Sequence, residues 1–220
     1  MLLKTVQRDK LDPSDDALFY DSPRFVTHVD DGFVAQLRAL YRDRIPANAC
    51  VFDFMSSWVS HLPEDVDYAY VEGHGLNKEE LARNPRFDHY FVQNLNRDRV
   101  FPLEDCAFDA VVNAVSVQYL QYPEEIFAEV YRILKPGGIA IFSFSNRMFY
   151  QKAIAAWRDS SGTARVNLVR RYFESVPGFG NIESVVKKSE ASAWMQMMAQ
   201  ITGVGGGDPF YAVIAEKIAP

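Results

Sequence analysis

Polar residues directly follow apolar runs at five places along the chain. Each run has the length and composition of a buried strand, and in an open parallel sheet ligands bind beyond the carboxyl ends of the strands. Hydroxyl, amide and carboxylate groups at those ends are suited to hydrogen bonding a polar ligand. The sequence therefore predicts one site, formed by residues 53–58, 73–77, 94–95, 113–119 and 143–147.

Several other chemistries lack the residues that they require. His28, His61, His74 and His89 show no HxxxH or HxH spacing, so no metal site is expected. The chain has neither a GxSxG motif nor a Walker-type loop, which leaves hydrolase and NTPase functions unsupported. A Rossmann-like oxidoreductase is another hypothesis, but the first strand is not followed by the GxGxxG motif that such a cofactor site requires.

The composition limits the partners and the compartment. The 220 residues carry a formal net charge of −6, which disfavours nucleic-acid backbones and anionic membranes, so we expect a small-molecule substrate. The two cysteines, Cys50 and Cys106, have no CxxC spacing, as is typical of a reducing compartment. No secretory segment is recognised, so a cytoplasmic location is expected, while the oligomeric state stays open.

The first 48 residues are predicted to form an N-terminal arm and a helical cover. The arm carries the turn-forming sequence LDPSDD and is expected to be loosely held. Asp30 or Asp31 then caps a helix in which Phe33, Leu37 and Tyr41 recur with a helical period.

Residues 49–220 alternate strand-like runs with helices and form the second predicted unit. The pattern indicates an α/β fold, with a Rossmann-like, doubly wound, mostly parallel seven-stranded sheet that ends in an antiparallel pair. One helix begins at Asn77, with Glu80 completing a capping-box-like pair, and another spans 123–135 before Pro136-Gly137-Gly138. The other predicted elements are strands at 50–54, 67–73, 89–95, 108–115, 139–145, 181–189 and 210–217, and helices at 148–157 and 164–174.

Within this pattern, FDAVVNAVSVQYL is followed by a helix, by RILKPGG and by a further strand. This ordered set resembles the class I S-adenosylmethionine-dependent methyltransferases, in particular their small-molecule branch. The resemblance covers about residues 49–218. It implies S-adenosylmethionine as the cofactor and methyl transfer to a small-molecule acceptor.

The first cofactor-binding loop departs from that family. There the first strand ends in D-x-G-x-G-x-G, because backbone must approach the cofactor closely. Here Asp53 matches the acidic position, whereas Met55, Ser56, Ser57 and Trp58 stand where glycines are expected. Two hypotheses follow: the serine hydroxyls rebuild the pocket, or Trp58 fills it and a degenerate domain binds a ligand or protein partner without catalysis.

The other strand ends also differ from the family pattern. Gly75 aligns with the ribose-binding acid; Glu72 is a substitute or faces solvent, and Asn77 is a ligand or a helix cap. Asn94 holds the adenine-binding position, where its side-chain oxygen can accept the same hydrogen bond. The cofactor-binding residues implied by the resemblance are Asp53, Met55, Ser56, Ser57, Gly75, Leu76, Asn77, Asn94, Leu95, Asn113 and Ala114.

The acceptor in such a fold meets the later strand ends and the N-terminal cover. By analogy, His28, Tyr119 and Arg147 are the predicted catalytic residues. Each has a structural alternative: Tyr119 as a packing aromatic, Arg147 as a partner of a surface carboxylate, and His28 as a partner of the following helix.

Overall fold

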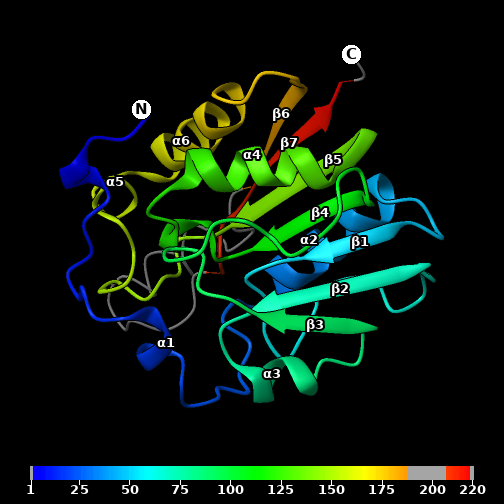
Figure 1. Cartoon of the computed structure of the whole chain (residues 1–220), viewed down its shortest axis with the longest axis horizontal. Coiled ribbons are helices and arrows are strands. Elements are labelled where there is room, and N and C mark those ends of the chain that lie inside the picture. Colours follow the sequence, from blue (N-terminus) through cyan, green and yellow to red (C-terminus); the bar gives the residue numbers. More distant parts are fainter. Residues whose placement is uncertain (1, 188–206, 219–220) are drawn as a thin grey trace.

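A seven-stranded sheet crosses the molecule in the order β3-β2-β1-β4-β5-β7-β6 (Figure 1). The computed structural model describes residues 2–187 and 207–218. Strands β1 to β5 are parallel to one another. Strand β7 is antiparallel to β5, and β6 is antiparallel to β7, which confirms the predicted sheet. The strands are β1 (Cys50–Asp53), β2 (Tyr70–Gly75), β3 (His89–Val92), β4 (Phe108–Ala114), β5 (Leu134–Phe144), β6 (Phe179–Lys187) and β7 (Phe210–Lys217).

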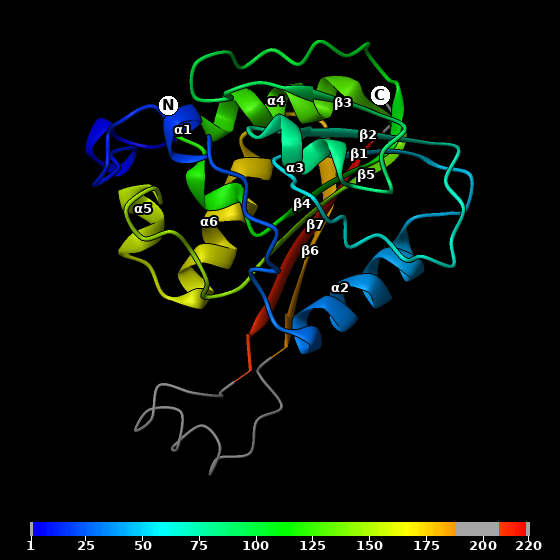
Figure 2. The ribbon, with the colours of Figure 1, turned by 90° about the horizontal axis from the view of Figure 1, so that it is seen from below.

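Helices cover both faces of the sheet, each face with its own apolar core (Figure 2). Helix α2 (Asp31–Arg44) buries Phe33, Leu37 and Tyr41 against one face. Helices α4 (Pro123–Ile133) and α6 (Gly162–Glu174) pack on the other face. The remaining helices are short: α1 (Asp16–Phe19), α3 (Lys78–Ala82), α5 (Ala155–Arg158), and the 3-10 turns η1 (Thr5–Gln7) and η2 (Val117–Tyr119).

The predicted start of the covering helix is confirmed. The Asp30 carboxylate accepts the Phe33 N–H at 2.8 Å, so it satisfies one of the free donors of the first turn. Helix α4 ends at Ile133, two residues before the predicted end. The Pro-Gly-Gly sequence lies inside β5, where the register against β4 shifts between Phe108 and Ala110 and Gly137 takes a φ of 78°.

Strands and helices do not alternate as regularly as predicted. Within the described residues, neither the β1–β2 connection (54–69) nor the β3–β4 connection (93–107) contains a helix. Both segments lack an apolar stripe with a helical period, so no helix face is available for burial. The helix predicted at 148–157 is reduced to the single turn of α5. One short apolar segment of the sequence lies outside the described residues; it contains Trp194, Met195, Met197 and Met198.

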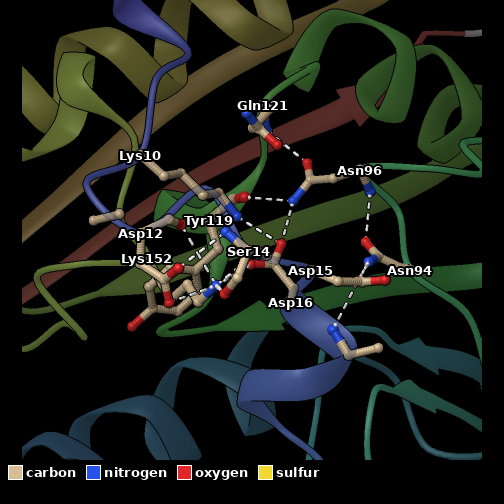
Figure 3. A network of polar contacts seen from close by, with 12 residues as sticks. Lys10, Asp12, Ser14, Asp15, Asp16, Asn94, Asn96, Tyr119, Gln121 and Lys152 are labelled. Atoms are coloured by element: carbon tan, nitrogen blue, oxygen red, sulfur yellow. Dashed lines mark hydrogen bonds and ion pairs between the residues drawn. The ribbon is translucent and has the colours of Figure 1, made fainter.

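The N-terminal arm was predicted to be loosely held, and this prediction is wrong. The fully buried Lys152 ammonium donates to the Ser14 carbonyl at 2.8 Å and lies 2.9 Å from the Asp12 carboxylate (Figure 3). Asp16 lies 2.6 Å from the Lys10 ammonium and also accepts the Asn96 amide at 2.8 Å. These contacts fix the arm across the carboxyl edge of the sheet, where burial strengthens charged hydrogen bonds.

Among the described residues, no helix is long and apolar enough to cross a membrane. In the same part of the chain, no three metal-ligating side chains come together.

Replacing Lys152 with methionine is expected to lower the free energy of unfolding by about 3 kcal/mol, because the buried Asp16 and the partly exposed Asp12 lose a fully buried cation. Urea denaturation measures the change. Lys135→Met is the matched control: its 2.8 Å pair with Asp109 is partly exposed, so it should lose about 1 kcal/mol or less. Equal losses in the two variants would contradict a structural role for the buried cation.

Candidate active site

One cavity of about 340 Å³ opens at the carboxyl ends of β1, β2 and β4, under the N-terminal arm. This is the edge at which an open α/β sheet binds ligands. Of the residues predicted individually as catalytic or cofactor-binding, all but Asn113 line it. Asn113 is buried in the sheet and donates its amide to the Phe54 carbonyl at 3.1 Å, so it joins β4 to the end of β1. The predicted residues that line the cavity are His28, Asp53, Met55, Ser56, Ser57, Gly75, Leu76, Asn77, Asn94, Leu95, Ala114, Tyr119 and Arg147.

The loop after β1 adopts a glycine-like conformation without a glycine. Met55 has a φ of 53°, in the left-handed region that glycine occupies at little cost. At the end of β4, the β-branched Val115 also has a φ of 53°, and both residues line the cavity. Surrounding contacts must hold both backbones, since such conformations carry strain.

His74 supplies those contacts for the first loop. Its Nδ1 accepts the Met55 N–H at 3.0 Å, and its carbonyl accepts the Ser56 N–H at 2.7 Å. Its other ring nitrogen lies 2.9 Å from the Gln93 carbonyl, which requires a proton on Nε2. Burial lowers the pKa of His74 to about 4, so the ring is neutral and joins the ends of β1, β2 and β3.

Gly75 allows the loop to lie close to β2. A Cβ at this position would be 2.6 Å from the Ser56 carbonyl oxygen, which is backbone and cannot move aside cheaply. The family pattern has the ribose-binding acid at the position of Gly75. In this structure a glycine at that position lets the loop after β1 lie close to β2. His74 was predicted to be at the site only as part of residues 73–77, and no local sequence pattern indicates its hydrogen bonds to the loop after β1.

Asp53 is buried beneath the loop. Its carboxylate accepts the hydroxyls of Ser56 at 2.9 Å and Ser60 at 2.6 Å. Burial raises the pKa of Asp53 to about 6, because the two hydroxyl donors only partly replace water. The Ser56 hydroxyl therefore donates inside the protein and presents only acceptor lone pairs elsewhere.

Trp58 does not line the cavity. Its ring packs edge-on against Phe25, with centroids 6.3 Å apart, and its indole N–H donates to the Val26 carbonyl at 3.2 Å. Both partners belong to the segment before α2. The tryptophan thus fastens the cover to the loop, and its ring leaves the cavity unfilled.

The carboxylates near β2 are arranged differently from the prediction. Glu72 neither lines the cavity nor faces solvent: it is buried and accepts from Tyr70 and from His89, the latter at 2.7 Å. Glu80, which was assigned to a capping box, instead accepts the Arg24 N–H at 2.6 Å and the Ser57 hydroxyl at 2.7 Å. It is buried and lines the cavity.

Asn77 and Asn94, two of the three asparagines predicted to bind cofactor, form hydrogen bonds within the protein. Asn77 caps α3 by accepting the N–H groups of Glu79 and Glu80, and its amide donates to two carbonyls, those of Tyr20 and Asp21. The helix-cap alternative is therefore the observed one. Asn94 donates its amide to the Asp15 carboxylate at 2.8 Å, so the arm contacts the predicted adenine position directly.

The predicted catalytic residues lie on the arm side of the cavity. The buried Tyr119 hydroxyl accepts the Phe149 N–H at 2.8 Å, and burial raises its pKa. His28 is exposed at the rim, edge-on to Phe149, with ring centroids 5.3 Å apart; partial desolvation lowers its pKa. Arg147 donates to the Asp208 carboxylate at 2.7 Å, as its structural alternative predicted, and also lines the cavity.

Comparison with known proteins gives matches over the middle of the chain. A family model described as "Methyltransferase domain" matches residues 64–142. The chain is 30% identical over 111 residues to the biotin biosynthesis bifunctional protein BioHC of Teredinibacter turnerae, covering 47% of this chain and 20% of that protein. It is 32% identical over 69 residues to the malonyl-(acyl-carrier protein) O-methyltransferase of Marinomonas sp., covering 31% of this chain and 24% of that protein. The chain thus spans at most about a quarter of either relative.

Solved structures share the fold at low sequence identity. An S-adenosylmethionine-dependent methyltransferase of Mesorhizobium loti has a TM-score of 0.52 at 17% identity, over 81% of this chain and 96% of that chain. The 4+2 cyclase SpnF has a TM-score of 0.57 at 15% identity, over 84% and 81%. Phosphoethanolamine N-methyltransferase 2 of Haemonchus contortus, in complex with S-adenosyl-L-methionine, gives 0.57 at 15% identity, over 87% and 54%.

Replacing Asp53 with asparagine is expected to stabilise the protein at pH 7.5 by up to about 3 kcal/mol, because an ionised carboxylate is no longer buried. With a folded pKa of about 6 against 3.8 unfolded, the aspartate protein loses stability as the pH rises through that window. The advantage of the variant should therefore shrink as the pH falls from 6 to about 4.

Urea denaturation at several pH values measures this difference. His61 and His74, each with a pKa lowered to about 4, make stability rise over the same window in both proteins, so the difference isolates Asp53. A stability difference that does not vary with pH would show that Asp53 is not the titrating group.

Proposed function

We propose that this chain is a class I S-adenosylmethionine-dependent methyltransferase, which transfers a methyl group from S-adenosylmethionine to a small-molecule acceptor. The observation that carries the proposal is the open cavity at the strand ends. His74 holds the loop after β1 at the edge of this cavity, and Trp58 packs against the segment before α2 and leaves the cavity free. A degenerate domain with Trp58 in the pocket would lack that space.

The residues present fit the cofactor, although not through the usual glycines. The loop at Met55 already has the left-handed backbone, and Gly75 lets it lie against β2. Leu76 and Leu95 line the cavity and supply apolar surface, which is suited to a purine ring. The set that would hold the cofactor is therefore the backbone of 55–57 and 74–76, with Leu95 and the carboxylate of Glu80.

Glu80 is proposed to replace the ribose-binding acid that is missing at Gly75. It is a buried carboxylate that lines the cavity, and each of its oxygens accepts one donor, from Arg24 and from Ser57. Each carboxylate oxygen can accept a second hydrogen bond, which suits a vicinal pair of hydroxyl groups. Ser57 donates to Glu80, so its hydroxyl oxygen is also available only as an acceptor.

S-adenosylmethionine supplies an electrophilic methyl group when bound. The chain has to align the acceptor with it and to exclude water, as an in-line displacement demands. The N-terminal arm and the segment before α2 enclose the cavity for this purpose. His28 has a lowered pKa and is neutral at pH 7, so its ring can take a proton from a hydroxyl or amine acceptor.

The direct test is calorimetric titration of the full chain with S-adenosylmethionine and, separately, with S-adenosylhomocysteine. Micromolar affinity for both supports the proposal and justifies a screen of acceptors. Absence of heat and of a thermal shift at millimolar ligand would refute it and leave the hypothesis of a non-catalytic binding domain.

Replacing Glu80 with glutamine is expected to weaken binding of S-adenosylmethionine by roughly tenfold to a hundredfold, because hydrogen bonds to a charged acceptor are lost. Glu79→Gln is the matched control, since Glu79 is exposed and pairs with Arg83 on the surface. Calorimetry of both variants, with thermal melts to verify folding, measures the effect. Equal affinities for the two variants would exclude Glu80 as a ligand.

A further inference from the structure

Arg24 lies on the segment between α1 and α2, and it lines the cavity. Its guanidinium carbon is 4.6 Å from the ring centroid of Phe19, 5.7 Å from that of Tyr20 and 5.4 Å from that of Phe149. A guanidinium is favoured over aromatic faces. The rings that would otherwise attract a cationic ligand are therefore already occupied by a cation of the protein.

The guanidinium has no carboxylate partner within residues 2–187 and 207–218. Its Nη2 donates to the Phe19 carbonyl at 2.9 Å, while the buried Nη1 donates to no atom of those residues. An unpaired buried donor is unfavourable, more so on a charged group. The chain is acidic overall, with 29 Asp and Glu residues against 23 Lys and Arg, so a shortage of carboxylates does not explain this.

Two other charged groups that line the cavity have a partner of opposite charge, whereas the buried carboxylates of Asp53 and Glu80 accept only uncharged donors. Asp16 is paired with Lys10 at 2.6 Å, and Arg147 with Asp208 at 2.7 Å. The Glu80 oxygens accept the Arg24 backbone N–H and the Ser57 hydroxyl. Of the two arginines that line the cavity, Arg147 has a carboxylate partner among the described residues and the Arg24 side chain has none.

From these contacts we propose that the methyl acceptor is a carboxylic acid with a flat apolar body, and that Arg24 binds its carboxylate group. A guanidinium presents paired N–H groups that match the two oxygens of a carboxylate. Tyr119 and His28 also line the cavity, each with its ring beside that of Phe149, and such ring surfaces suit an aromatic or unsaturated skeleton. This inference rests on the proposed function, because it assigns a substrate class to the acceptor side of that site.

The experiment uses the full chain saturated with S-adenosylhomocysteine and three probes of similar shape: benzoate, benzamide and benzyltrimethylammonium. Calorimetry and ligand-observed NMR measure their binding to the wild type, Arg24→Gln and Arg24→Lys. Arg83→Gln is the matched control: Arg83 also lies over an aromatic ring, 4.0 Å from the Phe25 centroid, but is exposed and pairs with Glu79.

We expect benzoate to bind at least about tenfold more tightly than benzamide or the ammonium probe, since only the carboxylate satisfies the guanidinium. Arg24→Gln should remove that preference while S-adenosylhomocysteine still binds, Arg24→Lys should retain part of it, and Arg83→Gln should leave it unchanged. The comparison among probes on the wild type holds even where a variant fails to fold.

Equal affinity for benzoate and benzamide, preference for the ammonium probe, or no benzoate binding to the saturated wild type would overturn the assignment. So would unchanged benzoate binding in a folded Arg24→Gln protein. Failure of S-adenosylhomocysteine to bind counts against the proposed function instead, and the same probes titrated into the protein alone then decide the role of Arg24.

Discussion

The contact between the loop after β1 and the end of β2 is the constraint on which the site depends. His74 accepts the Met55 N–H on its ring and the Ser56 N–H on its carbonyl, and Gly75 leaves room for the Ser56 carbonyl. These contacts hold a methionine in a backbone conformation typical of glycine. In this way the loop adopts a glycine-like backbone without a glycine-rich sequence.

Electrostatics below and above that loop act in opposite senses. Below it, Asp53 is buried with only two hydroxyl donors, which raises its pKa. Above it, the arm brings Asp12 and Asp16 against the fully buried Lys152, so charges offset each other (Figure 3). The burial of Asp53 is therefore electrostatically unfavourable, whereas the aspartates of the arm are paired with a lysine.

The N-terminal 48 residues are part of the site as much as a cover over it. Asp15 contacts Asn94 at the third strand end, Tyr20 and Asp21 accept from Asn77 at the second, and Arg24 donates its N–H to Glu80. The N-terminal residues thus form hydrogen bonds with polar groups at the strand ends, which would otherwise be free to contact a ligand. The same segment supplies Tyr20, Arg24 and His28 to the lining of the cavity.

The sequence alone determined the sheet and the gathering of the strand-end residues, because apolar periodicity fixes which elements are buried and parallel strands end at one edge. It placed Asp53, Gly75 and Tyr119 at the cavity. Only the tertiary structure decided what those groups bond to: Glu80 meets Arg24 across 56 residues and Asn94 meets Asp15 across 79. Such contacts join segments whose approach no local pattern encodes, and therefore the role of His74 and the open pocket beside Trp58 emerged only from the fold.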